Sequence, residues 1–137
     1  MQLHASCAAR RGVGVLIIGP PGSGKSRLVL KLIETGFLLV ADDRVELTDA
    51  VASAPTGLRG LIEVRGLGLL RLPYLRSCRV RLVAVFQSPE RFPSRTYDGL
   101  TGLPSIHLAE GHLFPRQISY ALSSLLHPSS HPAGAFA

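Results

Sequence analysis

The sequence has no long run of apolar residues and no recognisable targeting signal. No apolar stretch approaches the roughly 20 residues that a membrane-spanning helix needs. The start, Met1 to His4, has no basic region followed by an apolar one, so a secretory signal peptide is not expected. We therefore expect a cytoplasmic protein that does not engage a membrane.

Cysteine is also scarce, because the 137 residues contain only Cys7 and Cys78. The two are far apart in the sequence, lack C-x-x-C spacing, and form no set with histidines at the spacing of a zinc site. In a reducing compartment such residues are expected to be two buried free thiols.

The chain is basic, with a formal net charge of +6, and 13 of its 15 basic residues are arginine. Aromatic residues make up only 6% of the chain and do not interleave with the arginines, as single-stranded nucleic acid binding would require. We expect no nucleic acid partner. Two interpretations stay open: a basic surface from arginine-biased composition, or a docking face for an acidic partner or for nucleotide phosphates.

The length allows one domain, and a chain of this size buries roughly two thirds of its unfolded surface. Hydrophobic residues make up 46% of it, enough for a core without disulfides or a structural metal. No internal repeats occur. We expect one domain over residues 1–127 and a disordered tail over residues 128–137, where Ser, His, Pro and Ala dominate.

One glycine-rich stretch has the spacing G-x-x-x-x-G-K-S of a phosphate-binding P-loop. Its eight residues, here called the octet, are Gly19, Pro20, Pro21, Gly22, Ser23, Gly24, Lys25 and Ser26. A buried strand is predicted before it and an amphipathic helix after it, as this motif requires. Glycines let backbone N–H groups turn toward phosphate oxygens, while the lysine adds a mobile charge and the serine a hydroxyl for Mg²⁺. The octet is therefore predicted to bind the phosphates of a nucleotide.

A short strand precedes the octet strand, and the two are close enough to form an antiparallel hairpin. If its turn is centred on Arg11-Gly12, paired residue numbers sum to 23 and His4 lies opposite Gly19. Alternation of apolar and polar residues predicts that the first strand is half-buried. His4 is then either a histidine beside the phosphates or a surface residue on an edge strand.

Two adjacent carboxylates, Asp42 and Asp43, follow a buried strand predicted over residues 37–41. In P-loop enzymes the strand beside the phosphate strand commonly ends in an acid that holds Mg²⁺. Neighbouring side chains at a strand end point to different sides, so one acid can face the metal and the other the substrate. A solvated Asp-Asp turn is the alternative.

The remaining pattern predicts further strands over 44–48, 51–54, 61–64 and 79–86, a loop over 87–104, a short edge strand over 105–108, and a second helix from Pro115 to just before Pro128. Glu63 lies on the strand that precedes Gly66 and Gly68. An acid beside a glycine loop suits a second metal ligand, although by itself the pattern fits an ordinary strand and bulge better.

Together these stretches resemble the catalytic domain of the HPr kinase/phosphorylase family. The resemblance rests on His4-Ala5-Ser6, the octet, Val40-Ala41-Asp42-Asp43 and Ile62-Glu63-Val64-Arg65-Gly66-Leu67-Gly68, and covers residues 2–70 well. It implies an α/β P-loop core of the phosphoenolpyruvate carboxykinase-like type, with a mixed sheet, an N-terminal hairpin and flanking helices.

The same resemblance implies an activity, a donor and a partner. Such enzymes phosphorylate a serine of the small phosphocarrier protein HPr, use ATP or pyrophosphate with Mg²⁺, and reverse the reaction by phosphorolysis. Through HPr they regulate carbon and nitrogen metabolism via the phosphotransferase system. The family also suggests a ring-like homo-oligomer, although this chain looks like the short form that lacks an N-terminal domain.

By motif position, the resemblance makes His4, Lys25, Asp42 and Asp43 catalytic residues and Ser26, Asp42 and Glu63 metal ligands. The octet as a whole would bind the nucleotide. Either Asp42 or Asp43 can be the carboxylate that accepts the serine proton, and we favour Asp43.

Two departures from the family pattern concern the reverse reaction. In Tyr97-Asp98-Gly99-Leu100-Thr101-Gly102, Gly99 stands where the family has a catalytic arginine. The basic loop that follows in the family is reduced here to residues 112–117, in which Arg116 is the candidate substitute. Whether phosphorolysis is retained stays open.

Two other functions compete with the protein kinase. A P-loop kinase for a small metabolite would need a lid and a substrate pocket, for which little sequence remains. A nucleotide-binding regulatory module without turnover is favoured by the glycine at position 99.

Overall fold

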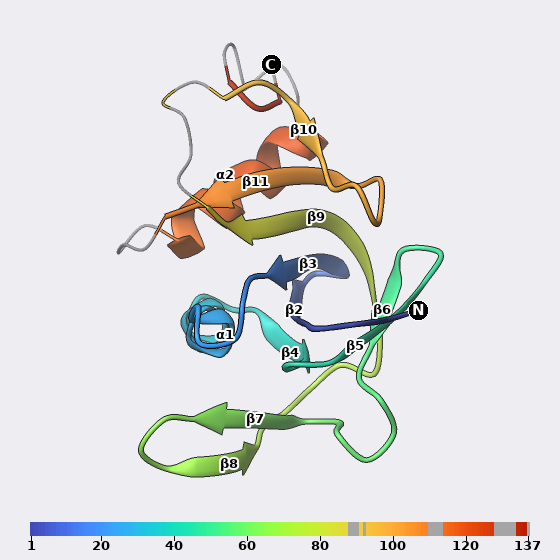
Figure 1. Cartoon of the computed structure of the whole chain (residues 1–137), viewed down its shortest axis with the longest axis vertical. Coiled ribbons are helices and arrows are strands. Elements are labelled where there is room, and N and C mark those ends of the chain that lie inside the picture. Colours follow the sequence, from blue (N-terminus) through green and yellow to red (C-terminus); the bar gives the residue numbers. More distant parts are fainter. Residues whose placement is uncertain (88–90, 92, 110–113, 128–133, 137) are drawn as a thin grey trace.

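The computed structural model describes residues 1–87, 91, 93–109, 114–127 and 134–136. Its elements are β1 (Gln2–Leu3), β2 (Ala5–Arg10), β3 (Val13–Ile18), α1 (Lys25–Glu34), β4 (Leu38–Ala41), β5 (Val45–Thr48), β6 (Val51–Ser53), β7 (Leu61–Val64), β8 (Gly68–Arg71), β9 (Cys78–Phe86), β10 (Thr96–Tyr97), β11 (Pro104–Leu108) and α2 (Phe114–Leu126). The β7–β8 hairpin lies at one end of the molecule, and α2 with β10 and β11 lies at the other (Figure 1). No helix among the described residues is long and apolar enough to cross a membrane.

The main sheet is mixed and runs in the order β1-β5-β6-β9-β3-β2-β4. β9 pairs in parallel with β3 on one side and with β11 on the other. β2 is antiparallel to both β3 and β4, so β3 and β4 point the same way. Because the carboxyl ends of β3, β4 and β9 share one edge of the sheet, the loops that follow them can meet there.

The placement of β4 corrects the sequence analysis, which put the acid-ended strand beside the octet strand. β2 lies between the two, and the other edge of β3 is taken by β9. β2 therefore occupies the position beside β3 that was predicted for β4. Because β2 is antiparallel to both β3 and β4, β4 runs parallel to β3. The acids that follow β4 therefore still lie at the edge of the sheet where the octet lies.

Tight turns set the register of two hairpins, and the first of them is as predicted. Arg11 and Gly12 have φ values of 53° and 76°, and the ladder pairs Ala5 with Ile18, so that paired numbers sum to 23. Asp49 and Ala50, with φ of 50° and 63°, join β5 to β6 in the same way. Left-handed values at both central residues are those of the two-residue hairpin turns that match strand twist.

Two other predictions about the strands are wrong, and the tail contains a buried residue. β2 is buried along Ala5–Ala9 rather than half-buried, because strands flank it on both edges and core covers both faces. β11 is not an edge strand, since β10, which lies inside the predicted loop, pairs with it. In the predicted tail, Phe136 is 2% exposed and belongs to the core. Residues 128–133 and residue 137 lie outside the described residues.

Both faces of the sheet are covered, which gives two clusters of buried side chains. One cluster packs α1 and α2 against β3, β9 and β11, and includes Leu28, Ile17 and Ile118. The other lies on the opposite face, where β5 and β6 fold over β2 and β3. Alternate residues of β2 serve the two faces, so that Ser6 points to the same face as α1 while Cys7 points to the other.

The two cysteines meet in the second cluster as free thiols, as predicted. Their sulfur atoms are 3.5 Å apart, and Gly14 on the intervening strand makes room, because a Cβ there would lie 2.5 Å from the Cys78 sulfur. The hydrogen bond between the thiols, together with burial, raises the pKa of Cys7 well above its ordinary value. The same bond lowers the pKa of Cys78, although burial opposes this.

Candidate functional site

The octet joins the end of β3 to the start of α1. Gly22 and Gly24 have φ of 79° and 105°, which L-residues with a side chain rarely adopt. Gly24 caps α1 and contributes no side-chain hydrogen bond, so the helix begins without a side chain over its N-terminal N–H groups. Free N–H groups at a helix N-terminus attract anions.

Lys25 is buried, with 6% exposure, and its ammonium group stays within the octet. It donates hydrogen bonds to the carbonyl oxygens of Gly19 at 2.9 Å and Pro20 at 3.2 Å. Both acceptors are neutral, so the positive charge of the ammonium group has no carboxylate partner among these contacts. An anion held by the octet would find this charge already in place.

Asp42 connects three elements at the sheet edge. Its Oδ1 accepts a hydrogen bond from the Ser26 hydroxyl at 2.7 Å and from the Ser6 hydroxyl at 2.9 Å. Its Oδ2 accepts a long bond, 3.4 Å, from the backbone N–H of Glu63. The structure therefore brings Asp42 directly to the octet, even though their strands are not neighbours.

Asp43 points to a different partner, as adjacent residues after a strand should. Its Oδ1 lies 3.3 Å from Nε2 of His4, and the two side chains are 61% and 49% exposed. His4 lies just beyond the last hairpin pair, Ala5 with Ile18, whose partner Ile18 directly precedes the octet. Asp43 also has a φ of 67°, a left-handed conformation that few residues other than glycine adopt and that Asp tolerates better than most.

Glu63 approaches the site through its backbone. Its neighbour Ile62 is fully buried, whereas Glu63 itself is exposed on β7. The contact that the structure gives between Glu63 and Asp42 uses the N–H group. The role of its carboxylate as a metal ligand remains a prediction.

One residue of the site was not singled out by sequence reasoning. Ser6 is fully buried and hydrogen-bonded to both acids, to the Asp42 carboxylate and to the Asp43 N–H. The available signal was a lone hydroxyl residue in a strand of small apolar residues, which needs a partner when it is buried.

The two positions offered for the reverse reaction lie elsewhere. Gly99 is exposed in the turn between β10 and β11, and Arg116 is exposed near the start of α2. Residues 112 and 113 of the reduced basic loop lie outside the described residues.

The residues at the octet fit a magnesium nucleotide. Ser23 Oγ is buried without a partner, which leaves one hydrogen-bonding atom of the octet unused. The described residues contain no cluster of three or more His, Cys, Asp or Glu side chains around a metal position. Mg²⁺ keeps several waters and is held through one or two carboxylates plus substrate phosphates, so Ser26 and Asp42 would suffice as protein ligands if the ion binds here.

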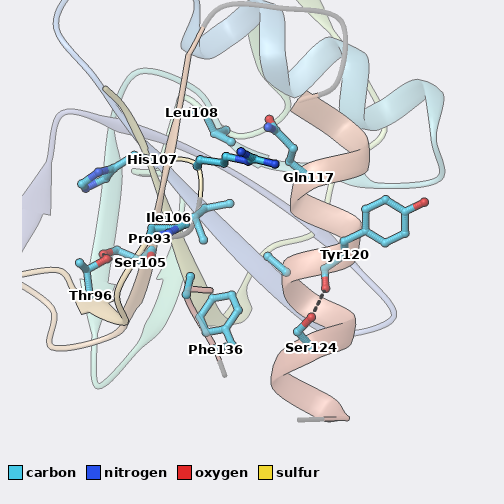
Figure 2. Close-up of a pocket in the computed structure, with 13 residues that line it drawn as sticks. Pro93, Thr96, Ser105, Ile106, His107, Leu108, Gln117, Tyr120, Ser124 and Phe136 are labelled. Atoms are coloured by element: carbon cyan, nitrogen blue, oxygen red, sulfur yellow. Dashed lines mark hydrogen bonds between the residues drawn. The ribbon is translucent and has the colours of Figure 1, made fainter. Parts of the chain in front are cut away.

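A concave region lies between β11, α2 and residues 134–136 (Figure 2). It encloses about 310 Å³, and none of the predicted site residues lines it. Two hydrogen bonds of its hydroxyl residues are local, Thr96 to Ser105 at 2.9 Å and Ser124 to the Tyr120 carbonyl at 2.8 Å. Only Gln117 among its lining residues has a buried oxygen without a partner. The surface that lines the hollow is mostly apolar, in contrast to the hydrogen-bonded side chains at the octet edge.

A strand, a glycine-rich loop with lysine and serine, and a helix N-terminus follow one another at the edge of a mixed sheet, with two acids beside them. These features define the class of protein, an α/β domain with the architecture of a P-loop fold. Residues 1–75 match the family model described as the HPr Serine kinase C-terminal domain. The chain belongs to this family.

Two curated relatives carry the name HPr kinase/phosphorylase. The protein from Clostridium tetani is 41% identical over 78 residues, which cover 54% of this chain and 26% of that protein. The protein from Xylella fastidiosa is 36% identical over 113 residues, which cover 73% of this chain and 36% of that protein. The chain thus spans about a quarter to a third of the length of these relatives.

A solved structure extends the likeness beyond the family match. The Hpr(Ser) kinase/phosphatase from Coxiella burnetii superimposes with a TM-score of 0.77 and 26% identity, covering 96% of each chain. The predicted fold class, an α/β fold with a mixed sheet, an N-terminal hairpin and flanking helices, is confirmed.

Proposed function

We propose that this chain is a Mg²⁺- and ATP-dependent kinase that phosphorylates a serine of an HPr-like phosphocarrier protein. Family membership supports the reaction class. The observation that carries the assignment of roles is the division of the two acids. Asp42 bonds to Ser26 of the octet, while Asp43 lies outward beside His4.

This division suits in-line phosphoryl transfer. Asp43, which is 61% exposed, is accessible to a serine on another protein and would accept the hydroxyl proton. The serine oxygen then forms its bond to the γ-phosphorus as the bond to the leaving oxygen breaks. His4, 3.3 Å away, would hold the Asp43 carboxylate toward the incoming hydroxyl.

The octet would hold the donor. Lys25, now bonded to two carbonyl oxygens, would turn to phosphate oxygens, and the N-terminal N–H groups of α1 would point at them. Ser26 and Asp42 would hold Mg²⁺, with Glu63 as a further candidate ligand. The bound ion would neutralise charge on the phosphates. Pyrophosphate presents the same phosphate oxygens and is therefore the alternative donor.

The test is incubation of the chain with HPr, Mg²⁺ and ATP, followed by the intact mass of HPr. We expect a gain of one phosphate, absent when the acceptor serine of HPr is replaced by alanine. Asp43→Asn should lower kcat by about 100-fold or more and leave nucleotide affinity within about twofold, because general-base catalysis contributes roughly 10²–10⁴. Adding inorganic phosphate to phosphorylated HPr tests phosphorolysis.

Other outcomes decide between the competing functions. Tight nucleotide binding with no phosphorylated HPr would favour a regulatory module, for which the exposed Gly99 is the supporting observation. Turnover of ATP with a sugar or a small hydroxy acid, and with no protein acceptor, would favour a small-metabolite kinase.

A further inference from the structure

Ser6 is a buried polar residue at the centre of the site edge. It lies on β2, between β3 and β4, and its side chain is 0% exposed. Its neighbours in the strand are small and apolar, and the rest of this face of the sheet is core. A buried hydroxyl group is destabilising unless it is hydrogen-bonded, so its partners indicate which groups it orients.

The Ser6 hydroxyl is bonded to both acids at once. It donates to Asp42 Oδ1 at 2.9 Å and accepts from the Asp43 backbone N–H at 3.2 Å. The first bond fixes the direction of the Asp42 carboxylate. The second bond holds the backbone of Asp43, whose φ of 67° is otherwise unfavourable for a residue with a side chain.

Asp42 Oδ1 has a second hydroxyl donor, Ser26, at 2.7 Å. The two donors are not equivalent, because Ser26 belongs to the octet at the start of α1 and its oxygen is the candidate metal ligand. If the Ser26 oxygen coordinates a cation, the hydrogen bond from its hydroxyl to Asp42 can be lost. Ser6, enclosed in the sheet, remains as the donor that keeps the carboxylate in place.

We propose that Ser6 is a positioning residue that orients both acids, the Asp42 carboxylate toward the metal and, through the backbone, Asp43 toward His4. The inference rests on the proposed function for the meaning of the two acids, but the contacts themselves do not depend on it. Partners of this kind behind a metal ligand typically change metal affinity by about 10- to 100-fold when removed.

The test compares Ser6→Ala with Ser105→Ala. Ser105 is a matched control, since it is 3% exposed, lies on β11 and bonds to Thr96 far from these contacts. The first readout is the Mg²⁺ concentration that gives half-maximal binding of a fluorescent ATP analogue. We expect Ser6→Ala to raise it by about tenfold, and Ser105→Ala to leave it within about twofold of wild type.

The second readout is steady-state phosphorylation of HPr. Ser6→Ala should lower kcat by about tenfold or more while KM for HPr changes by less than about threefold, because Ser6 would not contact the partner protein. Unchanged half-maximal Mg²⁺ concentration in Ser6→Ala would overturn the proposal. Failure of wild type to phosphorylate HPr would refute the proposed kinase, while the Mg²⁺ readout would still decide the role of Ser6.

A second pair of variants separates the hydroxyl from packing. Ser6→Thr keeps the hydroxyl, and Ser6→Val replaces it with a methyl group of nearly the same shape, so both add equal bulk to the strand. We expect Ser6→Thr to bind Mg²⁺-nucleotide at lower Mg²⁺ than Ser6→Val by about tenfold. Equal values for the two would count against any role of the hydroxyl.

Discussion

The octet edge and the hollow beside α2 are two regions of one molecule that differ in how their polar groups are used. At the octet edge, hydrogen bonds join β2, α1, β7 and the residues after β4, and most of them end on Asp42. In the hollow, the bond between Thr96 and Ser105 lies within one strand pair, and the bond from Ser124 to Tyr120 lies within one helix turn. The hollow is lined by β11 and α2, which lie on the opposite side of β9 from β3 and α1 (Figure 1).

This difference teaches that concavity alone does not mark the site. Polar groups that converge from separate elements cost stability unless they are satisfied, so their presence at one edge indicates a function. The hollow, in contrast, follows from how α2 and Phe136 pack on the sheet. Substitutions should therefore affect chemistry at one region and stability at the other.

The largest expected effect is on phosphoryl transfer in Lys25→Ala. Removal of a preorganised charge at the phosphates should lower transfer from labelled ATP to HPr by about 100-fold or more. Lys31→Ala is the matched control, because it removes the only other lysine of the chain, on the same helix. Undiminished labelling by Lys25→Ala would show that the lysine of the octet is not needed for transfer. It would also contradict the assignment of chemistry to the octet edge rather than to the hollow.

The next effect is on stability in Phe136→Ala. The ring is 2% exposed within the core beside the hollow, so its loss should lower the free energy of unfolding by about 3–5 kcal/mol. Tyr120→Ala, at a ring 70% exposed, should cost less than about 0.5 kcal/mol. Chemical denaturation measures both, and nucleotide affinity of the folded proteins should stay unchanged. A large loss of nucleotide affinity in Phe136→Ala would show that the two regions are coupled.

The smallest effect concerns the two buried oxygens without partners, one in each region. Ser23→Ala and Gln117→Met each remove an unsatisfied acceptor, so each should raise the free energy of unfolding by up to about 1 kcal/mol. Only Ser23→Ala should weaken ATP binding, by about tenfold, because a hydrogen bond to a charged phosphate contributes roughly 1.5 kcal/mol or more. Titration of a fluorescent ATP analogue measures this. Equal affinities in the two variants would mean that Ser23 Oγ does not meet the nucleotide.

Local parts of the fold could be predicted from the sequence because their causes are local. Arg11-Gly12 and Asp49-Ala50 each close a two-residue turn, and the turn fixes the register of its hairpin. The 3.6-residue period of α1 and the left-handed Gly36 after it, with φ of 98°, depend on neighbours in the sequence. The P-loop spacing likewise needs only its own eight residues.

Contacts between distant segments could not be predicted, because they depend on which strands become neighbours. The sequence predicts β4 beside β3, whereas in the sheet β2 lies between them. The meeting of Cys7 with Cys78 across Gly14 has the same origin. Phe136 lies in a stretch rich in Ser, His, Pro and Ala, a composition that predicts a tail, whereas its side chain is buried against the core.

The sequence by itself determined the chemical groups of the site: a glycine-rich octet with a lysine and a serine, a pair of acids after a strand, and a histidine before the hairpin. Only the tertiary structure decided which of these groups contact one another. It directs Asp42 to Ser26, sets Asp43 beside His4, and places Ser6 between the two acids. The physical reason is that residue types and turns follow from short-range rules, whereas the direction of a side chain at a sheet edge follows from strand order and pleat.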